Sequence, residues 1–207
     1  MKSFIPASYK YTGWLLILFA VLILPVSGFL PDWASFENGP IENTQVIVLL
    51  GGALLCVHFA HYSQGSPTHG MWLPSAGIFL ILAFRELSWG RVFMVERYSE
   101  IGEPILIASS AMPYRTAIHA AVGIVAVLCL YLLIRHVPWK RIFKEISFPW
   151  AQLALIVICI ALNTLGDHHA MFHTIRDQMI EELAELLMYF TFCHTAWYYY
   201  LKIEKKK

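Results

Sequence analysis

Six apolar runs, each about as long as a membrane is thick, constrain this chain more than any other feature of its sequence. A helix needs about 20 mostly apolar residues to cross a bilayer, and in lipid a helix satisfies its backbone hydrogen bonds within one segment. The sequence therefore predicts an all-α integral membrane protein, with six transmembrane helices in one bundle. The predicted spans are residues 14–30, 45–61, 72–88, 116–134, 150–166 and 183–201.

The composition agrees with immersion in lipid. The chain is 58% hydrophobic and 14% charged, with a mean hydropathy of +0.59, whereas about a quarter of a soluble domain is charged. Six spans and their loops occupy the 207 residues, so we expect a single membrane domain over residues 1–207 whose main partner is the lipid bilayer. The net charge of +1 produces no field that would recruit nucleic acid, so no nucleic-acid partner is expected.

The lysines and arginines predict an orientation, because loops rich in these residues stay on the cytoplasmic side. With the N-terminus inside, the inner segments hold 10 of the 15 Lys and Arg residues, including all eight lysines. Of the 14 acidic residues, only Glu145 and Glu204 fall inside. We therefore predict cytoplasmic N- and C-termini, and the short loops favour a bacterial inner membrane.

Two outer connections are predicted to contain more than plain loops. The apolar segment at residues 104–112 (PILIASSAM) is too short to cross a membrane, which favours a re-entrant or interfacial segment. In residues 170–180, Met171, Ile175 and Met179 recur at helical spacing. This spacing predicts a short amphipathic helix on the outer surface.

Ionisable residues gather at the predicted outer ends of the spans. Such residues are costly at membrane depth, which makes each of them a candidate for function. Glu86 is the strongest candidate because apolar sequence flanks it and the neighbouring arginine can pair with it. We predict a ligand- or ion-binding site formed by Arg85, Glu86, His119, Asp167, Glu182 and Glu185.

The same outer end carries residues that suit a divalent metal. Carboxylates and imidazoles together are ligands that Zn, Mn or Fe accept. The alternative is structural, because acids at a helix N-terminus stabilise the helix dipole, and no H-E-x-x-H pair is present. The candidate metal ligands are Glu86, Asp167, His168, His169, His173 and Glu182.

Two histidines on the inner side raise the weaker hypothesis of a haem. Histidines from two helices at matched depth can hold haem iron, and His58 and His194 meet that condition crudely. The repeated histidine pairs of a two-haem cytochrome are absent from the sequence. We therefore favour hydrogen bonds from these histidines to neighbouring helices.

Three classes of function are compatible with these residues. The leading expectation is binding or transport of a cation, proton or small polar solute, because Glu86, Asp167 and Glu182 come from three predicted helices and can converge. One alternative is a membrane-embedded, metal-dependent enzyme that uses the same cluster. Another is a non-catalytic subunit or scaffold that packs against a membrane-protein partner or a second copy. The scarcity of polar residues in mid-span weighs against a complete transport path.

Overall fold

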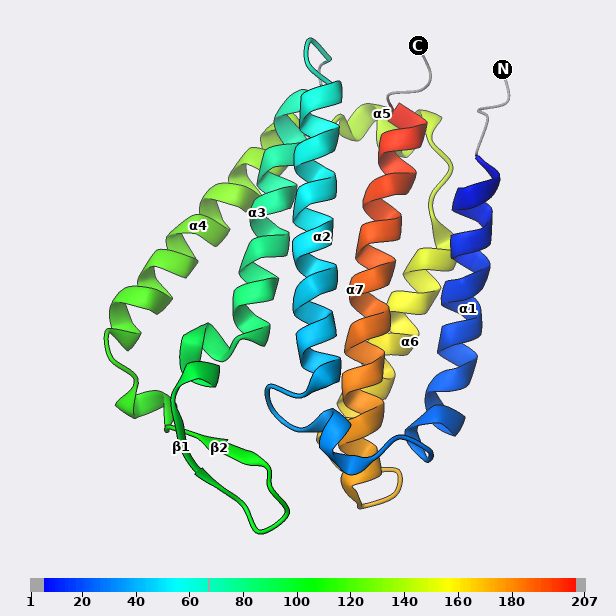
Figure 1. Ribbon diagram of the computed structural model, residues 1–207. Coiled ribbons are helices and arrows are strands. Elements are labelled where there is room, and N and C mark those ends of the chain that lie inside the picture. The colour runs from blue at the N-terminus through cyan, green and yellow to red at the C-terminus, as the bar shows by residue number, and fades with distance from the viewer. Residues whose placement is uncertain (1–5, 67, 204–207) are drawn as a thin grey trace.

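The helices of the protein stand side by side as a bundle in the computed structural model, which describes residues 6–66 and 68–203 (Figure 1). The α-helices are α1 (Ala7–Ser27), α2 (Pro40–Tyr62), α3 (His69–Glu86), α4 (Arg115–His136), α5 (Trp139–Glu145), α6 (Trp150–Asp167) and α7 (Ile175–Ile203). Short 3₁₀ helices cover Asp32–Ser35, Ser88–Phe93 and Ser109–Ala111. Strands β1 (Val95–Tyr98) and β2 (Pro104–Leu106) form an antiparallel hairpin.

Each predicted span overlaps a helix, and the apolar helices are compatible with a multi-pass membrane protein, although the number of six spans is not confirmed. Within the described residues, four segments are long and apolar enough to cross a membrane: Ala7–Ser27, Asp32–Tyr62, Arg115–His136 and Trp150–Asp167. Helices α3 and α7 are not among them. Both carry ionisable residues, and α7 buries many of its side chains against other helices instead of exposing them.

Helix α7 is the centre of the bundle and packs against α6, α2 and α1. Helix α3 packs on the other side of α2, and α4 packs mainly on α3. Gly52 allows the close approach in the middle, because a Cβ there would lie 2.6 Å from the Phe79 ring and 2.9 Å from Cys193 Sγ. Gly77 does the same between α3 and α4, where a Cβ would lie 2.6 Å from Cys129 Sγ.

The prediction of a separate short helix at residues 170–180 is wrong. Helix α7 begins at Ile175 and continues to Ile203, and the residues before it form a loop. The Asp177 carboxylate accepts hydrogen bonds from the backbone N–H groups of Phe172 at 3.0 Å and His173 at 2.7 Å, which hold this loop against the first turn of α7. Met179 is buried in the core, so the apolar spacing reflects packing inside the bundle.

The segment at residues 104–112, predicted to be re-entrant or interfacial, begins as a strand and ends in the 3₁₀ helix Ser109–Ala111, so the description all-α is incomplete. Its first part is β2, which pairs with β1 in the register Val95↔Leu106 and Tyr98↔Pro104. The pairing satisfies backbone groups between two strands, which an isolated apolar segment cannot do. Gly102 has a φ of 84°, which suits the tight turn between the strands.

The two ends of the bundle differ in charge. We call the end with α5, the start of α1 and the last turn of α7 the terminal end, and the opposite end, with the β1–β2 hairpin and the α6–α7 loop, the hairpin end (Figure 1). The lysines of the described chain all belong to elements at the terminal end; they are Lys10, Lys140, Lys144 and Lys202. The acidic residues of α3 and α7 lie toward the hairpin end.

Candidate functional site

A partly buried network of polar side chains joins α3 to α7 in the hairpin-end half of the bundle. The Arg85 guanidinium donates hydrogen bonds to Glu185 Oε1 at 3.0 Å and to the Tyr189 hydroxyl at 3.1 Å. Tyr189 in turn donates to Glu86 Oε1 at 2.6 Å. Arg85 Nη1 also lies 3.5 Å from Glu86 Oε1. One guanidinium therefore contacts two carboxylates, and a tyrosine hydroxyl lies between them.

Two amide side chains extend the contacts to neighbouring helices. Asn163 of α6 donates from Nδ2 to Glu185 Oε1 at 2.9 Å. Gln45 of α2 donates from Nε2 to Glu182 Oε2 at 2.8 Å and to the Glu182 backbone carbonyl at 2.9 Å. Gln45 Oε1 is buried and has no hydrogen-bond partner within residues 6–66 and 68–203. Polar groups from α2, α3, α6 and α7 thus meet around the first half of α7.

The network is buried on its acidic side and open on its basic side. Glu86 and Glu185 are 6% and 8% exposed, whereas the Arg85 side chain is 50% exposed. Buried carboxylates need compensating charge, and here one guanidinium faces two of them. When both carboxylates are ionised, the three side chains carry one surplus negative charge. Such a site attracts a proton or a positively charged group.

The structure brings together only some of the predicted ligand residues. Arg85, Glu86 and Glu185 form the network, and Glu182 adjoins it on the side of α2. His119 is exposed in the first turns of α4, with its ring 6.3 Å from that of Trp89. Asp167 is exposed at the end of α6. Neither side chain joins the network through a hydrogen bond or ion pair found in the described chain.

The predicted metal-ligand set is not assembled. His168, His169 and His173 are exposed in and around the loop between α6 and α7. Glu182 is hydrogen-bonded to Gln45 instead of facing these imidazoles. Among the residues that the structure describes, no group of three or more His, Cys, Asp or Glu side chains is arranged to hold a metal ion.

The two histidines considered for haem are in different environments. His194 stacks on Tyr9 with ring centroids 4.0 Å apart. Its Nδ1 lies 3.2 Å from Gln152 Nε2, and its Nε2 lies 3.1 Å from the Tyr9 backbone carbonyl. His58 is exposed on α2 beside Tyr62. Since both ring nitrogens of His194 have protein partners, His194 fits a helix-to-helix contact better than an axial iron ligand.

Sequence reasoning missed three members of the polar network. Tyr189 continues the face of Glu182 and Glu185, since the spacings are three and four residues, and this periodicity was the available signal. Asn163 is one of the few polar residues in mid-span, but the sequence does not indicate which helix it faces. Nothing in the sequence indicates that Gln45 faces Glu182, because that contact depends on which helices are neighbours.

Comparison with known proteins finds no matching family model, no similar curated protein and no similar solved structure. The fold and the network therefore define only a general class. The protein is a mostly helical bundle compatible with a multi-pass membrane protein, with a half-exposed arginine paired to two buried carboxylates near one end. Its activity must be inferred from the chemistry of that network.

Proposed function

We propose that this protein binds a proton or a cationic group at the network of Arg85, Glu86 and Glu185 within a six-span membrane bundle. The observation that carries the proposal is the surplus of carboxylate: both glutamates are buried and share one guanidinium. Placing a charged cluster within a membrane costs free energy, and this free-energy cost falls when a bound positive charge makes the cluster neutral. The half-exposed Arg85 leaves the network only partly enclosed by the protein.

The interior toward the terminal end supports binding over transport through the whole bundle. The next polar group along α7 is Thr191, whose hydroxyl donates to the Leu187 carbonyl of its own helix. Around it, α6 and α7 bury apolar residues such as Leu155 and Cys159. Thr191 therefore offers no free hydroxyl proton on α7 between the network and His194.

The proposed setting is a bacterial inner membrane, with the terminal end in the cytoplasm. The positions of Lys10, Lys140, Lys144 and Lys202 support this orientation, because lysines are retained on the cytoplasmic side. The network then lies in the outer half of the membrane. It would receive its proton or cation from the external medium.

The test is the melting temperature of the purified protein in phosphatidylcholine nanodiscs, measured across a cation panel. The panel contains Na⁺, K⁺, Mg²⁺, Zn²⁺ and methylammonium, and a parallel series varies the pH between about 5 and 8. A ligand at about 100 times its Kd stabilises the folded state by about 2.7 kcal/mol. We expect at least one cation, or the proton, to raise the melting temperature of the wild type.

Glu185→Gln separates the proposal from general charge effects. The glutamine keeps the size and one acceptor oxygen for Arg85 but removes the surplus negative charge, so the response should disappear. Glu145→Gln is the matched control, because Glu145 also pairs with an arginine (Arg141, 3.7 Å) but at the terminal end. Equal responses in the wild type and Glu185→Gln across the whole panel would contradict the proposal.

A further inference from the structure

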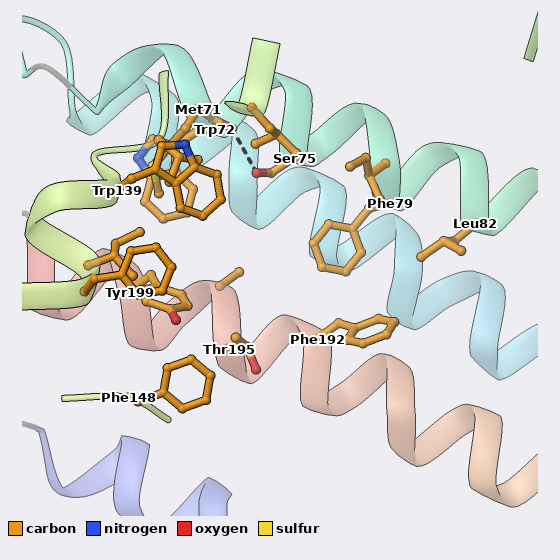
Figure 2. Close-up of a pocket in the computed structure, with 16 residues that line it drawn as sticks. Met71, Trp72, Ser75, Phe79, Leu82, Trp139, Phe148, Phe192, Thr195 and Tyr199 are labelled. Carbon is orange, nitrogen blue, oxygen red and sulfur yellow. Dashed lines mark hydrogen bonds between the residues drawn. The ribbon is translucent and has the colours of Figure 1, made fainter. Parts of the chain in front are cut away.

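A cavity of about 470 Å³ lies between α3, α4, α5 and α7 in the terminal-end half of the bundle (Figure 2). Its volume is within the range of about 300–1,000 Å³ that is typical of small-molecule sites. Ser75 and Thr195 in its wall direct their hydroxyl protons to backbone carbonyls of their own helices, at 2.8 and 2.7 Å. The rest of the wall is mainly aromatic and aliphatic, so its inner surface suits a hydrocarbon chain.

The short helix α5 makes one end of this cavity both apolar and cationic. Trp139, Ile142 and Phe143 line the cavity, and their spacing places them on one face of α5. Lys140 and Lys144 share another face at a spacing of four residues, and both are exposed. An amphipathic helix with lysines beside an aromatic face is typical of the boundary between acyl chains and lipid head groups.

A buried hydrogen-bond donor lies at the same end. Trp72 is 1% exposed, and its Nε1 has no hydrogen-bond partner in the described chain. Figure 2 shows Trp72 grouped with Trp139 and Tyr199, whereas Leu82 and Phe192 lie toward the opposite end of the cavity. Because both the ring and its Nε1 are buried, Trp72 closes this end of the cavity as a packed aromatic wall.

We propose that the cavity binds one acyl chain of an anionic phospholipid, with the phosphate head group on Lys140 and Lys144. The hydrocarbon chain would extend from α5 toward Leu82, along the aromatic and aliphatic wall of the cavity. The commitment to an anionic lipid rests on charge, since the exposed lysines Lys140 and Lys144 belong to α5, the helix at one end of the cavity. The site shares no residue with the network at Arg85 and does not depend on the function proposed for it.

Native mass spectrometry of the detergent-purified protein, mixed with equal amounts of phosphatidylglycerol and phosphatidylcholine, tests this proposal. We expect one phosphatidylglycerol to be retained per monomer. In Lys140→Gln/Lys144→Gln, the preference for phosphatidylglycerol should fall by roughly 10-fold to 30-fold. Each lysine near an anionic head group is expected to contribute a factor of roughly 3 to 5 to this preference. The matched control is Lys10→Gln/Lys202→Gln, which removes two lysines at the same end of the bundle and should keep the preference.

A second variant tests the cavity itself. Ala196→Phe fills the space from α7 and should abolish retention of both lipids, while circular dichroism confirms the helical fold. If that variant does not fold, Ser75→Leu fills the cavity from α3 and repeats the test. Equal retention of both lipids by the wild type, or equal preference in the two double-lysine variants, overturns the proposal. A lipid-free dimer in the same spectra would assign the cavity to a second copy of the chain and also overturns it.

Discussion

Replacing Arg85 with alanine is expected to destabilise the protein strongly, because it leaves two buried carboxylates without their shared cation. The guanidinium contacts Glu185 at 3.0 Å, Tyr189 at 3.1 Å and Glu86 at 3.5 Å. Removing one partner of a buried ion pair costs about 3–5 kcal/mol. The Arg85 side chain is half exposed, and water screens part of the interaction, so we expect about 3 kcal/mol.

The measurement is equilibrium unfolding in mixed micelles with increasing dodecyl sulfate, followed by circular dichroism. In a Glu86→Gln/Glu185→Gln background, neutral amides replace both carboxylates. Arg85→Ala should then lower the free energy of unfolding by only about 1 kcal/mol, through lost hydrogen bonds. The difference between the two backgrounds gives a coupling free energy of about 2 kcal/mol. Arg141→Ala, at an exposed pair, should cost at most about 1 kcal/mol. Equal costs of Arg85→Ala in both backgrounds would refute the electrostatic reasoning.

Three further predictions concern packing, a loop and orientation. Gly52→Leu should lower the stability by about 1–3 kcal/mol in a melting experiment, because its Cβ would lie 2.6 Å from an aromatic ring of α3. Gly51→Leu, where no atom lies within 4 Å of the added Cβ, should have little effect. Asp177→Ala should cost about 1–3 kcal/mol and speed hydrogen exchange at the backbone amides of the α6–α7 loop; unchanged exchange would contradict this role. In intact cells, an impermeant maleimide should label Glu100→Cys on the hairpin but not Glu145→Cys on α5, and the reverse pattern would invert the proposed orientation.

The positions of the helices could be predicted because length and apolarity in lipid leave few alternatives. The predicted span at residues 116–134 lies inside α4, which runs from Arg115 to His136. Errors occur where helices leave the apolar run. Helix α1 begins at Ala7, ahead of the predicted residue 14, and α7 begins at Ile175, ahead of residue 183. The first turns of α1 and α7 are stabilised by contacts with other segments of the chain, and hydropathy does not measure such contacts.

The candidate site was only partly predictable, because it depends on which helices are neighbours. The ionisable character of Glu86 and Glu185 is visible in the sequence, and both belong to the network. Asp167 carries the same chemistry at a similar predicted depth but is exposed at the end of α6. Asn163, one helical turn earlier on α6, faces the network in its place. The two residues are four apart and share a face of α6, so the rise of about 6 Å between them along the helix axis decides which one meets the network.

The central position of α7 has a consequence for how the protein is made. Of the described helices, α7 leaves the ribosome last, yet it supplies the partners of polar groups on helices made earlier. Until α7 is inserted, Gln45 of α2 lacks its partner Glu182, and Arg85 of α3 lacks its partner Glu185. Tyr9 of α1 likewise lacks His194, which lies 185 residues later in the sequence. Assembly is therefore expected to finish in one late step, when insertion of α7 pairs these polar side chains together. A nascent chain that stops before Ile175 presents unpaired polar groups inside the membrane, which are the features that distinguish an unassembled membrane protein from a completed one.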